Sequence, residues 1–166
     1  MKHLITSALL LALFTVAGCG FQLRGAANLP YDTLHVAAAT TSTFATQMRR
    51  AVASGSQTKV VDNPKDAQAT LQVLAEAREK SILSLSGGGR VREYQLRYRV
   101  QYRVVDKDNK ELRAPTTILL HRDFSFNDTD TLPKESEEAR LYRDMQTDAV
   151  SQLLRQLQAT RAAASL

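Results

Sequence analysis

The residue with the clearest chemical potential is Cys19, the only cysteine in the chain. It follows Val16-Ala17-Gly18 at the end of Leu4–Ala17, an uncharged stretch of 14 residues behind Lys2. A bilayer span takes about 20 apolar residues, so this stretch fits the h-region of a secretory signal peptide. Small residues before a cysteine are typical of the site that a bacterial lipoprotein signal peptidase cleaves. We therefore predict cleavage before Cys19, a diacylglycerol thioether on its sulfur and a third acyl chain on its freed amine.

Two or more acyl chains anchor a protein stably, because each buried methylene contributes about 0.8 kcal/mol. Gly20 follows the cysteine, where an aspartate would indicate retention in the inner membrane. The mature chain is therefore expected to be anchored to outer-membrane lipid through Cys19 and to face the periplasm. The alternative is an ordinary signal peptide that happens to contain a cysteine.

The mature chain of 148 residues (166 less 18) has the size of one domain with a single core. Its 21 basic and 17 acidic residues leave a net charge of +4 once Lys2 is removed. In the periplasm, lipid phosphates are more plausible anionic partners for this small positive charge than nucleic acid. An acylated Cys19 leaves no thiol for a disulfide, a metal or redox chemistry.

Other residues that could do chemistry do not combine into a catalytic or metal site. His35 and His121 each stand alone in an expected strand, without further ligands at metal spacing. Gly87-Gly88-Gly89 lacks the Lys-Ser/Thr ending of a phosphate loop and leads into a strand, so a turn is favoured. We find no nucleophile elbow and no His/Asp pairing. The sequence thus predicts a protein that is not an enzyme and holds neither cofactor nor metal.

The clearest periodic signal is a long strand over Tyr94–Val104, roughly 35 Å at 3.3 Å per residue. Apolar and aromatic side chains alternate there with polar ones, which indicates one face in a core and one in a polar setting. The polar face carries three arginines: Arg97, Arg99 and Arg103.

The remaining pattern predicts an α+β domain. Expected strands cover Thr33–Ala38, Gln57–Asp62, a segment from Ala69 and Thr116–Phe126, and expected hairpin turns surround 87–89 and 106–110. A helix capped by Thr41 or Ser42 ends at Gly55, and a C-terminal amphipathic helix follows a polar loop, 127–134, with Ser136 as its N-cap.

Two of the expected strands each contain a residue that does not fit the alternation of apolar and polar side chains. In the strand from Ala69, Leu71, Val73, Ala75 and Ala77 share one face and Gln72, Glu76 and Arg78 the other, while Leu74 interrupts the pattern and suggests cover on both sides. In Thr116–Phe126, Arg122 falls on the apolar face and therefore needs an edge position or a partner.

We thus expect a mostly antiparallel sheet of about four strands with two helices packed on one face. The expected organisation is a cleaved signal peptide (1–18), a lipidated extended lead-in (19–32), a single α+β domain (33–160) and a short flexible tail (161–166).

The opening Cys19-Gly20-Phe21-Gln22-Leu23-Arg24-Gly25 resembles the start of mature chains in the LptE family of lipopolysaccharide-assembly lipoproteins. The resemblance continues through the glycine-containing hairpin into Glu93-Tyr94-Gln95, then through the strand with Arg122 and Phe124, and through Lys134 into the last helix. It covers essentially the whole mature chain.

The resemblance implies an outer-membrane subunit that sits as a plug inside the LptD β-barrel and binds lipopolysaccharide during its delivery to the cell surface. The implied lipopolysaccharide contacts are Arg90 and Lys134, for which a generic turn charge is the alternative. Arg97, Arg99 and Arg103 would face the barrel lumen, although a solvated sheet face explains them equally well. A stand-alone periplasmic lipid-binding lipoprotein is the alternative function. A lipoprotein hydrolase is disfavoured by the missing nucleophile and base.

Overall fold

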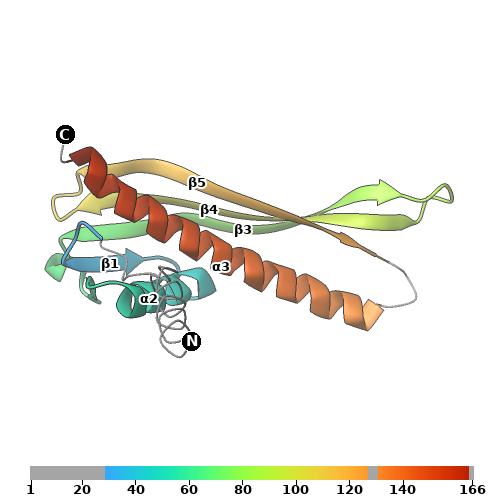
Figure 1. The fold of residues 1–166 in the computed structure, drawn as a ribbon, viewed down its shortest axis with the longest axis horizontal. Helices are drawn as coiled ribbons and strands as arrows, with labels where there is room; N and C mark the ends of the chain where they lie inside the picture. Colours follow the sequence, from blue (N-terminus) through green and yellow to red (C-terminus); the bar gives the residue numbers. More distant parts are fainter. Residues whose placement is uncertain (1–28, 127–130, 165–166) are drawn as a thin grey trace, which may run out of the picture.

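The computed structural model describes residues 29–126 and 131–164, so Cys19 and the residues around it lie outside the described part. The elements follow the order β1 (Thr33–Ala37), α2 (Thr43–Gly55), β2 (Lys59–Val60), a short 3-10 turn η1 (Pro64–Asp66), β3 (Ala69–Leu85), β4 (Val91–Asp106), β5 (Glu111–Ser125) and α3 (Thr131–Ala164). Figure 1 shows α3 running diagonally along a long, twisted sheet.

The sheet has five strands in the order β2-β1-β3-β4-β5 and is mixed. β1 runs parallel to both of its neighbours, whereas β3, β4 and β5 form antiparallel pairs. The α+β class with two helices is confirmed. The sheet has five strands rather than about four and is mixed, although the long β3–β4 and β4–β5 ladders make most of its pairing antiparallel. The parallel half arises because α2 carries the chain from β1 back to the same end of the sheet before β2 begins.

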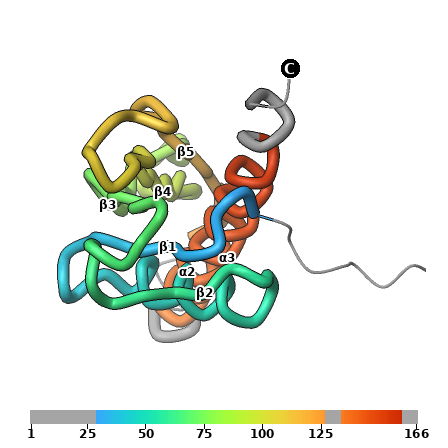
Figure 2. Tube along the Cα trace, turned by 90° about the vertical axis from the view of Figure 1, so that its left-hand side faces the viewer, coloured from blue at the N-terminus to red at the C-terminus, as the bar shows by residue number. Residues whose placement is uncertain are grey.

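Both helices pack on one face of this sheet, as the end-on view in Figure 2 illustrates. Thr43 of α2 donates to the Gln146 side chain of α3, and Gln47 donates to Thr147, each at 3.0 Å. The fully buried face of β4 is the predicted one, and its largest members are Tyr98 and Tyr102. Core residues run from Leu29, four positions before the expected start of the domain, to Leu157.

A β-bulge at Leu74 overturns the expected facing of β3. The register passes from Val73, opposite Tyr102, directly to Ala75, opposite Gln101. One extra residue exchanges the two faces of a strand. Beyond the bulge it is therefore Glu76, Arg78, Lys80 and Ile82 that face the helices, while Ala75 and Ala77 face away. Leu74 itself is 45% exposed rather than covered on both sides.

Several expected boundaries also move. α3 begins at Thr131, so Lys134 lies in its first turns rather than in a loop and Ser136 is not the N-cap. The same helix continues to Ala164, past the expected end of the domain at Thr160. Ser42 is the cap of α2, where its side chain accepts from the Ala45 amide, and α2 ends at Gly55 as predicted.

Two parts of the molecule differ in how they are packed. We call β1, β2, α2, the adjoining ends of β3 and β4, and Met145–Leu157 of α3 the body. The arm comprises Arg78–Tyr98 of the β3–β4 hairpin, the end of β5 from Leu120 and Lys134–Tyr142 of α3. The turn of the hairpin extends beyond the end of β5 (Figure 1). No helix in the described residues is long and apolar enough to cross a membrane.

Candidate functional site at the end of the arm

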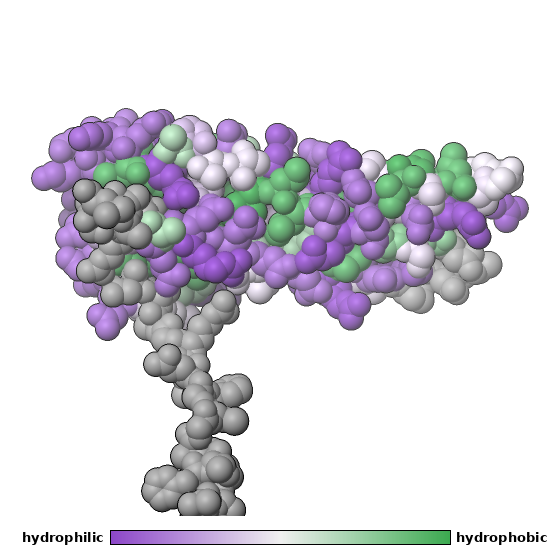
Figure 3. Space-filling model, turned by 45° about the horizontal axis from the view of Figure 1, so that its top comes forward, coloured by the Kyte–Doolittle hydropathy of each residue, from purple (hydrophilic) through white to green (hydrophobic). Residues whose placement is uncertain are grey.

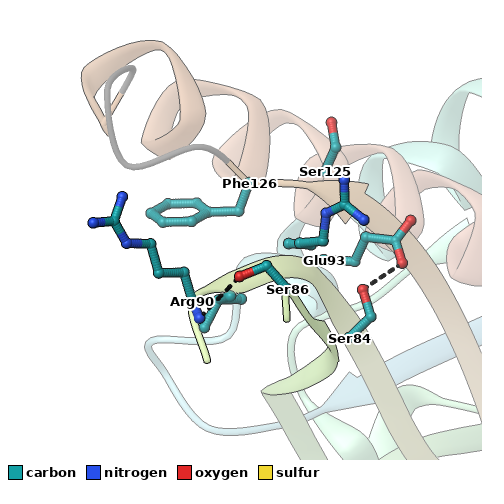
Figure 4. Close-up of a pocket in the computed structure, with 8 residues that line it drawn as sticks. Ser84, Ser86, Arg90, Glu93, Ser125 and Phe126 are labelled. Atoms are coloured by element: carbon teal, nitrogen blue, oxygen red, sulfur yellow. Dashed lines mark hydrogen bonds between the residues drawn. The ribbon is translucent and has the colours of Figure 1, made fainter. Parts of the chain in front are cut away.

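A hollow of about 560 Å³ lies at the end of the arm. Its lining comes from both strands of the hairpin and from the end of β5: Ser84, Ser86, Arg90, Val91, Arg92, Glu93, Ser125 and Phe126. Figure 4 shows the Phe126 ring beside the Arg90 side chain at this hollow. The amide of Phe126 donates to the Arg92 carbonyl at 2.7 Å, which continues the pairing of β5 with β4 up to the hollow.

The glycine-rich turn places Arg90 at this hollow. The Ser86 amide donates to the Arg90 carbonyl at 2.7 Å, and the Arg90 amide donates to the Ser86 hydroxyl at 3.1 Å. Gly89 has φ = 77°, a left-handed conformation that glycine adopts without strain. The expectation of a hairpin turn around 87–89 is confirmed, and the turn fixes the backbone from which the Arg90 guanidinium projects.

Lys134 approaches the same end of the arm from α3. Its ammonium donates to the Glu137 carboxylate at 2.8 Å and contacts the Ser125 hydroxyl at 3.5 Å. Ser125 lines the hollow, so Arg90 and Lys134, 44 positions apart in sequence, lie near one cavity. Arg92 lines it as well. In the sequence its charge resembles that of any solvated strand residue, so alternation gives no reason to assign Arg92 to a site.

Apolar side chains are exposed next to these cations. Ile82, Leu83 and Leu85 of β3 are 57%, 47% and 55% exposed, and Figure 3 shows hydrophobic residues gathered at this end of the molecule. The one carboxylate in the lining belongs to Glu93, and it accepts a hydrogen bond from Ser84 at 2.7 Å. Cations beside exposed apolar surface suit a ligand that is both anionic and apolar.

Arg97, Arg99 and Arg103 lie on the opposite, helix-free face of the sheet and do not join the hollow. Arg99 lies 3.7 Å from the Glu79 carboxylate and Arg103 lies 3.7 Å from that of Glu111, and all of these side chains are at least one-third exposed. The prediction that these three arginine side chains point away from the core is confirmed. Exposed pairs of this kind contribute about 0–1 kcal/mol to stability, so this face is polar without being needed for the fold.

The bulge creates a polar row under α3 that alternation alone could not reveal. Arg78 donates to Gln146 at 2.9 Å and lies 5.5 Å from the Tyr142 ring centroid, and Lys80 forms a 2.6 Å ion pair with Glu138. Arg122, which the sequence left in need of a partner, reaches Asp148 of α3 at 2.6 Å. These contacts hold α3 against the sheet, both in the arm and in the part of the helix that continues into the body.

Tyr98 lies where the body meets the arm. Its hydroxyl donates to the Glu76 carboxylate at 2.7 Å, and Glu76 also accepts from Ser42, the cap of α2. Burial, and after it the hydrogen bond to Glu76, raise the pKa of Tyr98 well above its usual value. The hydroxyl therefore stays protonated and joins α2 to the sheet through Glu76.

The two histidines have separate surroundings. The His35 ring lies 3.0 Å from the Val61 carbonyl, and His121 is exposed opposite Arg97. Within residues 29–126 and 131–164, no three His, Cys, Asp or Glu side chains gather as a metal site requires.

Comparisons with known proteins converge on one family. The family model described as "LptE: Lipopolysaccharide-assembly" matches residues 31–157. A protein of Yersinia enterocolitica named LPS-assembly lipoprotein LptE is 31% identical over 168 residues, which cover 98% of this chain and 80% of the relative. Its namesake in Yersinia pestis is 29% identical with the same coverage.

Solved structures agree with this assignment. Lipoprotein B of Nitrosomonas europaea, described as uncharacterized, superposes with a TM-score of 0.77 at 41% identity, over 87% of this chain and 94% of that one. The rare lipoprotein B of Shewanella oneidensis superposes with a TM-score of 0.69 at 26% identity, over 81% and 99% of the two chains. Because the family model spans most of the chain and the sheet with its two helices recurs in these structures, the chain belongs to the LptE family of lipopolysaccharide-assembly lipoproteins.

Proposed function

We propose that this chain is an outer-membrane lipoprotein subunit of the lipopolysaccharide translocon. It acts as plug and assembly partner of the LptD β-barrel and binds lipopolysaccharide during delivery to the cell surface. Cys19 holds it in the periplasmic leaflet through its acyl chains, and the folded domain lies in the barrel lumen.

The observation that carries the ligand part of this proposal is the combination of charge and apolar surface at the end of the arm. Lipopolysaccharide presents phosphates and acyl chains close together. Arg90 and Arg92 at the hollow and Lys134 beside Ser125 supply cations for phosphates, which bind through charge-assisted hydrogen bonds. Ile82 and Leu85, both more than half exposed, supply apolar surface within the same hairpin.

The helix-free face supports the plug role. The lumen of a large outer-membrane barrel is polar, so a plug needs a wet, charged exterior. Arg97 and Arg99 are exposed on that face, and Arg103 is partly exposed there.

A paired charge reversal tests the ligand site. In the variant Arg90→Glu with Lys134→Glu, lipopolysaccharide binding should fall at least tenfold at low salt, because phosphates then meet repulsion. The effect should shrink as salt rises, since exposed charges are screened beyond about 10 Å at 0.1 M. Copurification with the barrel should persist, because a plug contacts its barrel over far more surface than one hairpin end.

A matched control has the same change in net charge at the other hairpin turn. Lys107→Glu with Lys110→Glu alters exposed residues of the β4–β5 turn, outside the hollow. This control should bind lipopolysaccharide like the parent. Equal losses from both reversals would mean that overall charge, not this site, governs binding.

The anchor is tested by Cys19→Ala. Metabolic labelling with a fatty acid should label the parent but not this variant, which should lose membrane attachment. Label that persists in the Cys19→Ala protein would contradict the lipoprotein assignment.

A stand-alone periplasm-facing lipid-binding lipoprotein is the second candidate. It is favoured by Ile82 and Leu85, which expose apolar surface next to the cations of the hollow and could contact a lipid without a barrel. A pull-down from detergent-solubilised outer membrane separates the two, because only a translocon subunit copurifies with a barrel.

A further inference from the structure

An apolar strip crosses the arm on the face that carries the helices. Ile82 of β3 is paired with Tyr94 of β4, and Tyr94 is paired with Phe124 of β5. The Tyr94 and Phe126 rings pack edge to face, with centroids 5.2 Å apart. Ile82 of β3, Tyr94 of β4 and Phe126, the residue that follows β5, thus form a continuous surface.

This strip is open to solvent although it lies on the core side of the sheet. Ile82 is 57% exposed, and Tyr94 and Phe126 are partly exposed, whereas Leu96 and Tyr98 on the same face of β4 are fully buried under α3. Side chains on that face are normally covered, so the strip is a stretch of core-like surface that the described residues cover only in part.

The strip ends at the charged hollow. Phe126 belongs to both, since its ring contacts Tyr94 and its side chain lines the cavity with Arg90 and Arg92. Lys80, which is paired with Glu138, lies over the Tyr94 ring, 4.2 Å from its centroid. A molecule seated on the strip would therefore place a charged end in the hollow.

We infer that Ile82, Tyr94 and Phe126 form the seat of a single hydrocarbon chain of an anionic amphiphile whose charged group lies in the adjoining hollow. This rests on the proposed function and assigns the acyl part of the ligand to residues other than the cations. The occupant follows from charge complementarity: apolar surface alone would accept any hydrocarbon group, but Arg90 and Arg92 in the adjoining hollow select an anionic one.

Linear alkyl phosphates below their micelle concentration are the probe. They are measured against the mature chain with Cys19→Ala, which retains every core residue from Leu29 to Leu157. Each methylene buried on the strip should tighten binding about three- to fourfold. Inorganic phosphate should bind weakly, and alkyl trimethylammonium ions of equal length should bind more weakly than the phosphates.

The position is tested by a fluorescent reporter. The sequence contains no tryptophan, so Ile82→Trp provides a single indole, which excitation at the red edge of the absorption band selects over the five tyrosines. Its emission should shift to the blue as alkyl phosphate binds. Leu119→Trp is the matched control, because Leu119 is 59% exposed, close to the 57% of Ile82, but lies on the helix-free face opposite Arg99. Its emission should stay unchanged.

Affinity gives the second readout. Ile82→Ser should remove most of the dependence on chain length and leave inorganic phosphate binding as it is, while Leu119→Ser should change neither. Ile82 is exposed, so the variant should keep its fold, which a thermal melt checks. Chain-length-independent binding, equal shifts of both reporters, or a shift with anionic vesicles but none with monomeric amphiphile would each overturn the inference.

These outcomes separate the two proposals. If the protein binds lipopolysaccharide and copurifies with the barrel, but its affinity for alkyl phosphates does not depend on their chain length, the strip is not the acyl site and the proposed function stands. If the parent protein binds alkyl phosphates with the expected chain-length dependence but does not copurify with a barrel, the translocon role is wrong and the strip remains the acyl site.

Discussion

The body and the arm are held together by different interactions, although one sheet and one helix run through both. In the body, α3 places Met145, Ala149, Leu153 and Leu157 against the sheet, all fully buried. In the arm the same helix is fastened by the Lys80–Glu138 ion pair and by the Tyr142 hydroxyl, which donates to the Glu79 carbonyl at 2.8 Å.

This difference separates stability from function. Buried apolar surface contributes about 25 cal/mol per Å², whereas partly exposed ion pairs contribute about 0–1 kcal/mol. The body should therefore carry most of the unfolding free energy. The arm can expose apolar and charged groups for a ligand because the fold does not depend on burying them.

The largest effect should come from the junction of the two parts. Tyr98→Asp should prevent stable folding, because Tyr98 is fully buried and its replacement sets a carboxylate beside Glu76. An unpaired buried charge costs several kcal/mol, comparable with the total stability of a domain.

Arg99→Asp is the control on the next residue. Its side chain is 51% exposed and paired only at 3.7 Å with Glu79, so we expect a loss of about 1 kcal/mol or less. Yields of protease-resistant protein measure both variants, and equal losses would mean that β4 presents the other face to the core.

The sequence predicted the facing of a strand correctly where apolar and polar residues alternate without interruption. β4 alternates without interruption from Tyr94 to Tyr102, and its facing was predicted correctly. β3 has a similar composition, but the bulge at Leu74 exchanges its faces, so Glu76 and Arg78 were placed on the wrong side. Leu74 does interrupt the alternation at this point, but an apolar residue on the polar face is also what a strand covered on both sides would show, so the interruption was not recognised as a bulge.

The strand topology and the contacts between residues far apart in the sequence were harder to predict than the facing of the strands. The parallel pairing of β1 depends on where α2 returns the chain, which periodicity does not record. The approach of Lys134 to the hollow depends on α3 beginning at Thr131, which brings Lys134 to Ser125. The resemblance to a known family supplied Arg90 and Lys134 as candidates, whereas Arg92 and Phe126 emerged only from the three-dimensional arrangement.

The second prediction contrasts one α3 side chain from the body with one β3 side chain from the arm. Leu153→Ala should lower the unfolding free energy by about 2–5 kcal/mol, because it leaves a cavity in the core. Lys80→Ala, which breaks the ion pair with Glu138, should cost about 1 kcal/mol or less. Urea denaturation measures both. A Lys80→Ala loss as large as that of Leu153→Ala would show that the Lys80–Glu138 pair contributes as much to stability as a core side chain.

The third prediction uses alkaline pH. Burial raises the pKa of Tyr98 and of Tyr142, so both phenols stay protonated in the folded state where they would ionise in the unfolded one. Their contribution to stability is fully present below the ordinary phenol pKa of about 10 and is lost as pH rises above it.

Tyr98→Phe removes one of these groups. Between pH 9 and 11 its unfolding free energy should fall by about 1 kcal/mol less than that of the parent. At pH 7 it should be about 1 kcal/mol less stable, because Glu76 loses a hydrogen bond. Denaturation curves at several pH values measure the effect, and parallel curves for the two proteins would show that Tyr98 ionises alike in both states.

The smallest effect on stability is expected at Glu137. Its carboxylate holds the Lys134 ammonium at 2.8 Å within one turn of α3, and the two side chains are 35% and 20% exposed. Such a pair on a helix contributes about 0.2–0.5 kcal/mol, so Glu137→Gln should leave the melting temperature nearly unchanged.

Binding should respond more than stability does. Glu137→Gln removes a carboxylate that competes with a phosphate for Lys134, so lipopolysaccharide should bind a few-fold more tightly at low salt, and the gain should vanish at high salt. Glu135→Gln is the matched control, since Glu135 is exposed on the same helix and forms none of the ion pairs found among the described residues. Glu135→Gln should give the smaller gain. Equal gains from both variants would mean that the arm responds to net charge, and the specific role of Lys134 would then be lost.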